Sequence, residues 1–183
     1  MALHMRRAVF LDRDGVINRA MVRHGRPYPP ATLFEVEILP GVRRAMLALH
    51  QKDWLLVVVT NQPDVARGIT PRAQVEAINA YLQQELPIDD FRTCFHDSGD
   101  GCSCRKPLPG ALLDAARGHN IDLGASYMVG DRWRDTEAGA SAGCKTFFID
   151  YGYDEKQPES VDFRVSSLSE ATDIILGRTY EKS

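Results

Sequence analysis

The stretch AVFLDRDG at positions 8–15 decides the fold. Its apolar first half predicts a buried strand over 7–12, and two carboxylates, Asp12 and Asp14, stand where that strand ends. Gly15 allows the chain to turn sharply directly after them. Ligands of open α/β sheets bind at the carboxyl ends of the strands, so this junction marks the expected site.

The two carboxylates can share one small site, because side chains at positions i and i+2 of an extended chain point the same way. Two like charges this close are costly unless a cation lies between them or one carries a proton. Asp12 and Asp14 therefore predict a divalent metal, acid–base chemistry, or both. The pattern D-x-D-G by itself is equally typical of a surface turn, so the decision rests on the rest of the chain.

Apolar segments alternate with segments of helical period along the rest of the sequence. The run from Leu55 to Val59 does not alternate with polar residues, which is typical of a strand covered on both faces. This rhythm predicts a Rossmann-like, doubly wound, mostly parallel sheet with helices on both faces. Strands are expected over 7–12, 54–60, 91–95, 126–130 and 145–149, with a weaker one over 162–166, and helices over 41–52, 71–86, 109–119, 134–142 and 168–177.

The length of 183 residues, 44% of them hydrophobic, suits one well-buried core. We expect a single domain over 7–178, an N-terminal extension over 1–6 that resembles a tag remnant, and a C-terminal tail over 179–183. The proline-rich segment 18–39 is expected to be a long irregular loop. It is too short to form a separate cap domain.

Charge and hydropathy exclude several classes of partner. The net charge is −3 and no basic run stands out, which disfavours nucleic acid, because binding the phosphate backbone needs clustered Lys and Arg. No apolar stretch approaches the roughly 20 residues that span a bilayer. The first residues lack the apolar core and cleavage site of a secretory signal, so we expect a cytoplasmic location. The expected form is a monomer that binds a small molecule.

Polar side chains also stand where the later strands end or the next helix begins. Because the carboxyl ends of parallel strands meet at one edge of a sheet, we expect these groups to converge. Phosphoryl transfer from a monoester needs such a set: a carboxylate nucleophile, a divalent cation, a lysine and a hydroxyl that hold the phosphate oxygens. Each group alone is common at strand ends, and it is their order that predicts this chemistry. The groups are Thr60, Asn61, Gln62, Arg105, Lys106, Asp131 and Asp135.

The motifs D-x-D-G, T-N, R-K-P and G-D-x-x-x-D occur in this order over about residues 7–176. They resemble the haloacid dehalogenase (HAD) superfamily of phosphatases, and more closely its small cap-less branch with heptose bisphosphate phosphatases and histidinol phosphatases. The resemblance implies that Asp12 is the nucleophile, forming an aspartyl-phosphate, and that Asp14 is general acid and then base. It also implies that Thr60 and Lys106 hold the transferring phosphate.

The same resemblance implies a catalytic Mg²⁺. Its expected ligands are the Asp12 carboxylate, the backbone carbonyl of Asp14 and the Asp131 carboxylate. Asp135 is expected to orient Lys106 or a metal-bound water rather than to bind the ion.

A second metal site is predicted by the pattern C-x-H-x₅-C-x-C, formed by Cys94, His96, Cys102 and Cys104. Three thiols and an imidazole are a tetrahedral zinc set, and four protein ligands leave no open position, so the Zn²⁺ should be structural. The alternative is a set of unrelated buried cysteines. Relatives in the resembled branch carry a zinc loop at this place. Cys144 stands apart and is expected to be a core residue.

Two features disagree about the substrate. Residues 60–68 resemble the heptose bisphosphatase loop, although Pro63-Asp64 stand where Ser-Gly is usual, whereas the short gap between His96 and Cys102 resembles histidinol phosphatases. An arginine near the active site bears more directly on substrate than loop length does. We therefore expect D-glycero-D-manno-heptose 1,7-bisphosphate, cleaved at its 7-phosphate, with histidinol phosphate as the alternative. The expected substrate-binding residues are Asn61, Gln62, Arg67 and Arg105.

With no cap domain, the loops 18–30, 61–70 and 94–108 are expected to form the walls of the substrate pocket. Two further alternatives come from other functional classes. A receiver-like phosphorylatable switch also uses Asp, Thr and Lys on a parallel sheet, but it places its phosphoacceptor on a later strand than its acidic pair. A zinc-stabilised binding module with an inactive site is disfavoured because every polar group that the chemistry requires is present.

Overall fold

β1 (Ala8–Leu11) lies inside a six-stranded parallel sheet with the strand order β5-β4-β1-β6-β7-β8 in this computed structural model. The register pairs Ala8 with Leu55 and Val9 with Tyr127. The structure describes residues 5–178, so positions 1–4 of the predicted extension and the predicted tail 179–183 lie outside it. The other strands are β4 (Leu55–Asn61), β5 (Asp90–Cys94), β6 (Tyr127–Gly130), β7 (Lys145–Ile149) and β8 (Phe163–Val165).

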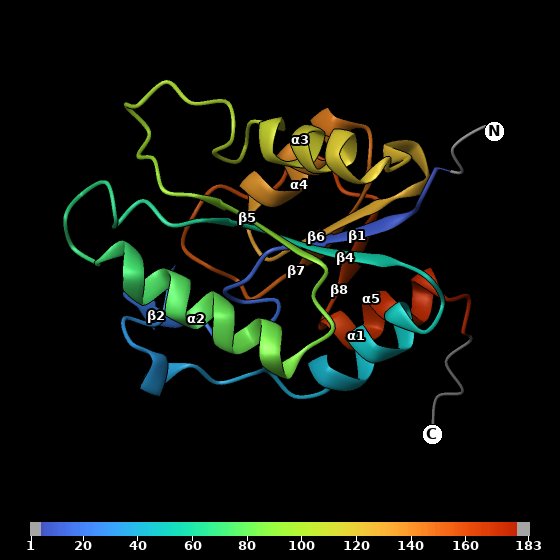
Figure 1. Cartoon of the computed structure of the whole chain (residues 1–183), viewed down its shortest axis with the longest axis horizontal. Helices are drawn as coiled ribbons and strands as arrows, with labels where there is room; N and C mark the ends of the chain where they lie inside the picture. The colour runs from blue at the N-terminus through green and yellow to red at the C-terminus, as the bar shows by residue number, and fades with distance from the viewer. Residues whose placement is uncertain (1–4, 179–183) are drawn as a thin grey trace.

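Helices cover both faces of the sheet. Val9 and Leu11 of β1 enter one apolar core and Ala8 and Phe10 the other, because successive side chains of a strand point to opposite faces. Figure 1 shows α3 and α4 on one face and α1, α2 and α5 on the other. The helices are α1 (Val42–His50), α2 (Arg72–Glu85), α3 (Gly110–His119), α4 (Trp133–Ala142) and α5 (Leu168–Ile175).

This architecture confirms the predicted doubly wound sheet, and every predicted strand and helix is present with bounds that agree within two residues. The division into one domain over 7–178 with two short flanking segments stays a prediction. No helix among residues 5–178 is long and apolar enough to cross a membrane.

The segment 18–39 was expected to be irregular, and this expectation was wrong. It contains an antiparallel hairpin of β2 (Met21–Arg23) and β3 (Arg26–Tyr28), followed by the 3₁₀ helix η1 (Leu33–Glu35). The two turn residues, His24 and Gly25, both have positive φ, 50° and 73°, as the tight turns of hairpins require. The proline inside β3 hid the strand, because proline is tolerated only in edge strands.

The carboxyl ends of the strands carry the long loops. In Figure 1 the loops after β4 and β5 extend from one end of the sheet, on the left, and the β2–β3 hairpin lies at that same end. Asp12 directly follows β1, and its backbone N–H still pairs with the carbonyl of Val129 in β6 at 3.0 Å. The sheet therefore fixes the position of the first predicted catalytic residue.

Candidate active site

Three carboxylates meet beyond the ends of β1 and β6. Asp12 follows β1, Asp131 follows β6, and Asp135 lies in the first turn of α4. All three are buried, and one carboxylate oxygen from each lies within 4.8 Å of the others. Gly15 makes this approach feasible, because a Cβ at that position would lie 1.9 Å from Asp131 Oδ2.

Lys106 is the buried cation among these carboxylates. Its Nζ lies 2.8 Å from Asp12 Oδ1 and 2.7 Å from Asp135 Oδ1, and it donates to the carbonyl of Val59 at 2.6 Å. Only 2% of the residue is exposed. Burial lowers its pKa, but the carboxylates of Asp12 and Asp135 raise it more, so the net shift is upward and the ammonium stays charged.

One ammonium does not balance three buried carboxylates. Burial first, and then the charge of Asp135, raise the pKa of Asp12 to about 6, against the opposing effect of Lys106. Burial and the charges of Asp12 and Asp135 also raise the pKa of Asp131 well above its ordinary value. The site therefore holds surplus negative charge, which a proton or a divalent cation can neutralise.

The residues present fit a divalent cation. Asp131 Oδ1 is buried and has no hydrogen-bond partner among residues 5–178. Buried polar atoms nearly always have a partner, so this oxygen is a candidate metal ligand. Both oxygens of Asp135 are already engaged, one by Lys106 and the other by the backbone N–H of Arg132 at 3.0 Å. Asp131 is thus better placed than Asp135 to bind an ion together with Asp12.

The Asp14 carboxylate is held by three neighbours on the same rim. Asn18 Nδ2 and Gln62 Nε2 each donate to it at 2.9 Å. Arg13 approaches both carboxylate oxygens at 3.1 Å through Nε and Nη2. The orientation of Asp14 is therefore determined by the surrounding protein, and the carboxylate remains at the wall of the pocket that contains Asp12.

Arg13 is a functional candidate that the sequence analysis missed. Its side chain is fully buried, and beyond Asp14 it donates to Asn79 Oδ1 in α2 at 2.9 Å. Asn79 in turn donates to Thr93 Oγ1 of β5 at 3.1 Å. This chain of polar contacts anchors the turn after β1 to two other elements. The sequence analysis assigned no role to Arg13 or to Asn79, because the two residues are far apart in the chain and only the fold brings them together.

Thr60 and its neighbours at the carboxyl end of β4 differ in the groups that they contact. Thr60 lines the pocket beside Asp12, and its Oγ1 accepts a hydrogen bond from Gln62 Nε2 at 2.9 Å. The hydroxyl proton of Thr60 is thus left available for a ligand oxygen. Gln62 is buried and lies behind Thr60 and Asp14, which differs from its expected role as a direct substrate ligand.

Asn61 also contacts the protein through both ends of its amide. Its Nδ2 donates to the carbonyl of Lys106 at 3.0 Å, and its Oδ1 accepts from the backbone N–H of Lys106 at 3.1 Å. Asn61 therefore holds the main chain of Lys106, although it also lines the pocket. The predicted contact with substrate stays a prediction.

Two adjoining cavities open at this end of the sheet. The smaller, of about 70 Å³, is lined by Asp12, Asp14, Thr60, Lys106 and Asp135, among others. The wider cavity has a volume of about 310 Å³. Residues 27–29 line both cavities. Residues of the three predicted loops, 18–30, 61–70 and 94–108, line these cavities, as expected. Residues at the start of α4 line them as well, which the sequence analysis did not predict. Five arginines line the wider cavity: Arg26, Arg67, Arg105, Arg132 and Arg134.

These arginines differ in how their charge is balanced. Arg67 pairs with Asp97 through Nε at 2.7 Å and with Asp64 through Nη1 at 3.2 Å. Arg132 pairs with Glu155, its Nε 3.0 Å from Oε1. The expected substrate ligand Arg67 thus lies in the wall but already has two carboxylate partners.

Arg105 and Arg134 carry less compensated charge. Arg105 donates to the carbonyl of His96 at 3.2 Å and lies 3.9 Å from Asp97. The buried Nε of Arg134 has no hydrogen-bond partner among the described residues. Burial, followed by the positive charges of Arg132 and Arg105, lowers the pKa of Arg134. An anion at this wall would relieve that repulsion.

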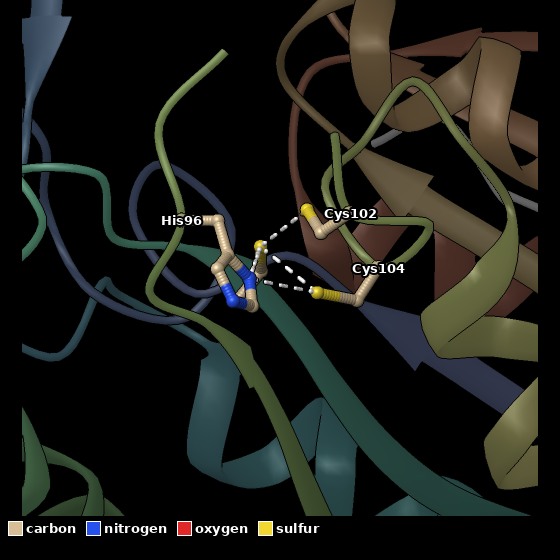
Figure 2. A group of neighbouring side chains, drawn as sticks. His96, Cys102 and Cys104 are labelled. Carbon is tan, nitrogen blue, oxygen red and sulfur yellow. Dashed lines mark hydrogen bonds between the residues drawn. The ribbon is translucent and has the colours of Figure 1, made fainter. Parts of the chain in front are cut away.

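The predicted zinc ligands gather at the end of β5. Figure 2 shows His96, Cys102 and Cys104 pointing toward one another. Cys94 Sγ lies 3.6 Å from His96 Nδ1, 3.7 Å from Cys102 Sγ and 3.1 Å from Cys104 Sγ. Ligands of a tetrahedral zinc ion lie about 3.6–3.8 Å apart. The first two distances match this spacing and the third is shorter, and all four ligand atoms lie within 4.8 Å of one another, so the donor set is one that can hold Zn²⁺. Burial raises the pKa of the Cys94 thiol to about 12, and metal binding would release that proton.

Comparison with known proteins agrees with this geometry. A HAD-hydrolase-like family model matches residues 103–171. The chain is 38% identical over 156 residues to the D-glycero-β-D-manno-heptose-1,7-bisphosphate 7-phosphatase of Bordetella bronchiseptica, which covers 81% of this chain and 83% of that protein. The enzyme of the same name from Escherichia coli K12 is 38% identical over 151 residues, 76% of each chain. This chain belongs to the HAD-like phosphatases. Members of this family are phosphoric monoester hydrolases.

Solved structures extend the likeness to the whole fold. The D,D-heptose 1,7-bisphosphate phosphatase of B. bronchiseptica, in complex with magnesium and phosphate, superposes with a TM-score of 0.80 at 33% identity, over 94% of this chain and 99% of that one. A HAD-like phosphatase from Mesorhizobium loti gives a TM-score of 0.74 at 28% identity, over 98% of this chain and 90% of that one. The arrangement of strands that places Asp12 beside Asp131 is therefore shared with this HAD-like phosphatase family.

Proposed function

We propose that this phosphatase is a Mg²⁺-dependent D-glycero-D-manno-heptose 1,7-bisphosphate 7-phosphatase that works through an aspartyl-phosphate on Asp12. One observation carries the proposal: Lys106 Nζ contacts both Asp12 and Asp135, whose carboxylates cluster with that of Asp131, and the buried Oδ1 of Asp131 has no hydrogen-bond partner among residues 5–178. This juxtaposition of nucleophile, ammonium and free carboxylate oxygen is the set that transfer of a phosphoryl group requires.

The chemistry follows from the positions of the side chains. An Asp12 carboxylate oxygen attacks phosphorus, the bond from phosphorus to the ester oxygen breaks, and Asp14 protonates the leaving alkoxide. A water molecule then attacks the aspartyl-phosphate, giving its proton to Asp14 and releasing phosphate and free Asp12. Lys106 and the Thr60 hydroxyl offset the charge on the phosphoryl oxygens in both steps. Asp14 and Thr60 share the donor Gln62, which keeps their spacing fixed.

Mg²⁺ would be held by the carboxylates of Asp12 and Asp131 and by the backbone carbonyl of Asp14. When bound, it neutralises the surplus charge of the site and removes the repulsion between Asp12 and a phosphate dianion. Asp135 is assigned to Lys106, because both of its oxygens already have partners. The B. bronchiseptica structure is a complex with magnesium and phosphate, which supports a bound Mg²⁺ in this family but does not bear on its individual ligands.

Zn²⁺ is proposed as a structural ion in the loop 94–104, held by Cys94, His96, Cys102 and Cys104. Four protein ligands leave no coordination position for a substrate. The last of them is separated from Lys106 only by Arg105. A zinc-bound loop would therefore hold the backbone of Arg105 and Lys106 in place, and with it the positions from which their side chains reach the pocket.

The substrate assignment rests on the arginine wall beside the catalytic cavity. A bisphosphate carries a second phosphate group away from the cleaved one. Arg105, whose carboxylate neighbour Asp97 is 3.9 Å away, and Arg134, whose buried Nε has no partner among the described residues, offer it the least balanced positive charge of this wall. Histidinol phosphate carries a cationic amine and no second phosphate, so this wall would repel it. The names of the related enzymes support the same choice.

A parallel assay tests the substrate. The purified protein with Mg²⁺ is given heptose 1,7-bisphosphate, histidinol phosphate and p-nitrophenyl phosphate, and phosphate release is measured, with NMR to identify the phosphate that leaves. We expect the highest kcat/KM for the bisphosphate, with loss of its 7-phosphate. A higher kcat/KM for histidinol phosphate would overturn the substrate assignment, and stable phosphorylated Asp12 without turnover would favour a switch.

A further inference from the structure

The chain between β7 and β8 carries two tyrosines that the proposed chemistry does not use. Tyr153 donates its hydroxyl to Asp131 Oδ2 at 2.9 Å, and Tyr151 donates to the carbonyl of Gly15 at 2.9 Å. The two rings pack against each other with centroids 5.5 Å apart. Residues 150–155, here called the strap, thus contact both the turn after β1 and the residue after β6.

Hydrogen bonds and ion pairs hold the strap against the β2–β3 turn, the residue after Asp131, and β8. The backbone N–H of Asp154 donates to the carbonyl of Gly25 in the β2–β3 turn at 2.8 Å. Glu155 pairs with Arg132, the residue that follows Asp131. At the other end, Asp150 pairs with Arg164 of β8 at 3.0 Å. Tyr153 therefore approaches Asp131 from a segment that neighbouring elements hold in place.

The two oxygens of Asp131 have different surroundings. Oδ2 accepts from Tyr153, whereas Oδ1 is buried without a partner among residues 5–178. Rotation about the last side-chain bond of aspartate is broad, so an unsupported carboxylate would sample several orientations. A hydrogen bond from the Tyr153 hydroxyl to Oδ2 restricts this rotation and leaves Oδ1 available to bind a metal ion.

We propose that Tyr153 is a positioning residue that orients Asp131 Oδ1 for Mg²⁺ binding. The inference rests on the proposed magnesium function and deepens it. Partners of metal ligands commonly set ligand orientation, and their loss costs about 10–100-fold in metal affinity. Tyr151 has a different task, because its acceptor is the carbonyl of Gly15 and not an expected metal ligand.

The two tyrosines form a matched pair for the experiment. Y153F and Y151F each delete one hydroxyl from the same strap, at hydrogen bonds of equal length. Mg²⁺ binding to each zinc-loaded, Mg²⁺-free protein is measured by isothermal titration calorimetry, without substrate. We expect Y153F to bind Mg²⁺ about 10–100-fold more weakly than wild type, and Y151F to stay within about threefold of it. Y153L removes the same donor with a different apolar shape and should match Y153F.

Kinetics separate positioning from a loss of structure. For Y153F the Mg²⁺ concentration that gives half-maximal activity should rise by the same factor, while kcat at saturating Mg²⁺ falls less. Equal Mg²⁺ affinity in Y153F and wild type overturns the inference and leaves the proposed function intact. Equal weakening in Y151F and Y153F also overturns it, because the strap as a whole would then be responsible. A wild-type protein that binds no Mg²⁺ overturns both proposals.

Discussion

The two groups of metal-ligating side chains are built in opposite ways. The cysteine–histidine cluster comes from one short stretch, residues 94–104. Cys94 is buried, Cys102 and Cys104 are half-buried, and His96 is exposed. The carboxylate group combines residues 12 and 131, which only the pairing of β1 with β6 brings together. The first group depends on one loop, whereas the second depends on the sheet. Soft sulfur ligands in the first and hard oxygen ligands in the second select different metals.

Lys106 connects the two groups. It lies two residues after Cys104, the last member of the cysteine–histidine cluster, but its ammonium lies among the carboxylates. Asn61 also holds its main chain from β4. The position of Lys106 therefore depends on the loop and on the sheet at once, and separate perturbations of the two groups should have distinguishable effects.

The largest effect should come from the carboxylate group itself. Asp12→Asn removes the nucleophile while keeping its shape, so we expect kcat to fall on the order of 10⁴-fold or more, as for other lost nucleophiles. The measurement is steady-state phosphate release, with acid-quenched protein checked for covalent phosphate. Zinc content serves as the control and should be unchanged. Substantial activity in this variant would remove Asp12 from its assigned role.

Loss of the zinc loop should be the next largest effect. Cys104→Ser should remove most of the bound zinc, lower the Tm and reduce kcat by about 10²-fold, because a catalytic group displaced by about 1 Å can cost that much. Metal analysis, thermal unfolding and kinetics measure the three outcomes. Cys144→Ser is the matched control, since Cys144 is buried and is not a member of the group formed by Cys94, His96, Cys102 and Cys104. Full zinc content in the Cys104 variant would contradict the assignment of this ligand.

The buried Arg13 network should affect both stability and acid–base catalysis. Arg13→Met removes the partner of Asp14 and leaves Asn79 Oδ1 without its donor. Breaking a buried pair costs about 3–5 kcal/mol, and Asp14 is slightly exposed, so we expect about 3 kcal/mol in urea unfolding. Because Arg13 contacts the proposed general acid Asp14, the kcat of the variant should fall more for a substrate with a poor alkoxide leaving group. The loss should be smaller for p-nitrophenyl phosphate, whose leaving group needs no protonation. Equal losses on both substrates would mean that Arg13 supports only the fold.

The arginine wall should give a smaller, substrate-dependent effect. Arg134→Ala removes uncompensated charge, so kcat/KM for the bisphosphate should fall about 10-fold, the value of one hydrogen bond to a charged group, with little change for p-nitrophenyl phosphate. Arg67→Ala should cost the bisphosphate less than Arg134→Ala, because Asp97 and Asp64 already balance the charge of Arg67. The reverse order would restore Arg67 as the main ligand of the second phosphate.

The pH dependence of Mg²⁺ binding should give the smallest effect near neutrality. The pKa of Asp12 in the metal-free protein is raised from 3.8 to about 6, so Mg²⁺ must displace a proton below about pH 6, where affinity should fall up to about 10-fold per pH unit. For a raised carboxyl pKa, the stability that this group contributes is present below pH 3.8 and lost as the pH rises through about 6. Calorimetry and thermal unfolding with and without Mg²⁺ at pH 5 to 8 measure both trends.

Local patterns predicted those parts of the site that a few neighbouring residues determine. The spacing of Cys94, His96, Cys102 and Cys104 predicted a cluster that the coordinates bring together. The run before Asp12 predicted β1 with bounds correct to one residue. The hairpin at residues 21–28 was missed, because a turn of His24 and Gly25 and a proline in β3 lack the usual signals of a hairpin.

Contacts between distant residues could not be predicted from such patterns. Gln62 is buried and donates to Thr60 and to Asp14, and the contact with Asp14 joins residues 48 positions apart that no local pattern relates. Arg67 faces Asp97, a contact across thirty positions of sequence. The partnership of Arg13 with Asn79 and that of Tyr153 with Asp131 also join elements whose relative placement no single segment encodes.

The sequence by itself determined the strand-and-helix order, the four sulfur and nitrogen ligands, and which carboxylates, hydroxyl and lysine stand at strand ends. Each of these follows from residue type and short spacing, which act through local geometry and the burial of apolar side chains. Only the tertiary structure decided which oxygen of Asp131 lacks a partner among residues 5–178, which arginines have the least balanced charge, and which tyrosine contacts Asp131. Those outcomes depend on the distance between groups far apart in the chain, because burial strengthens electrostatic and hydrogen-bond interactions only between groups that the fold brings into contact.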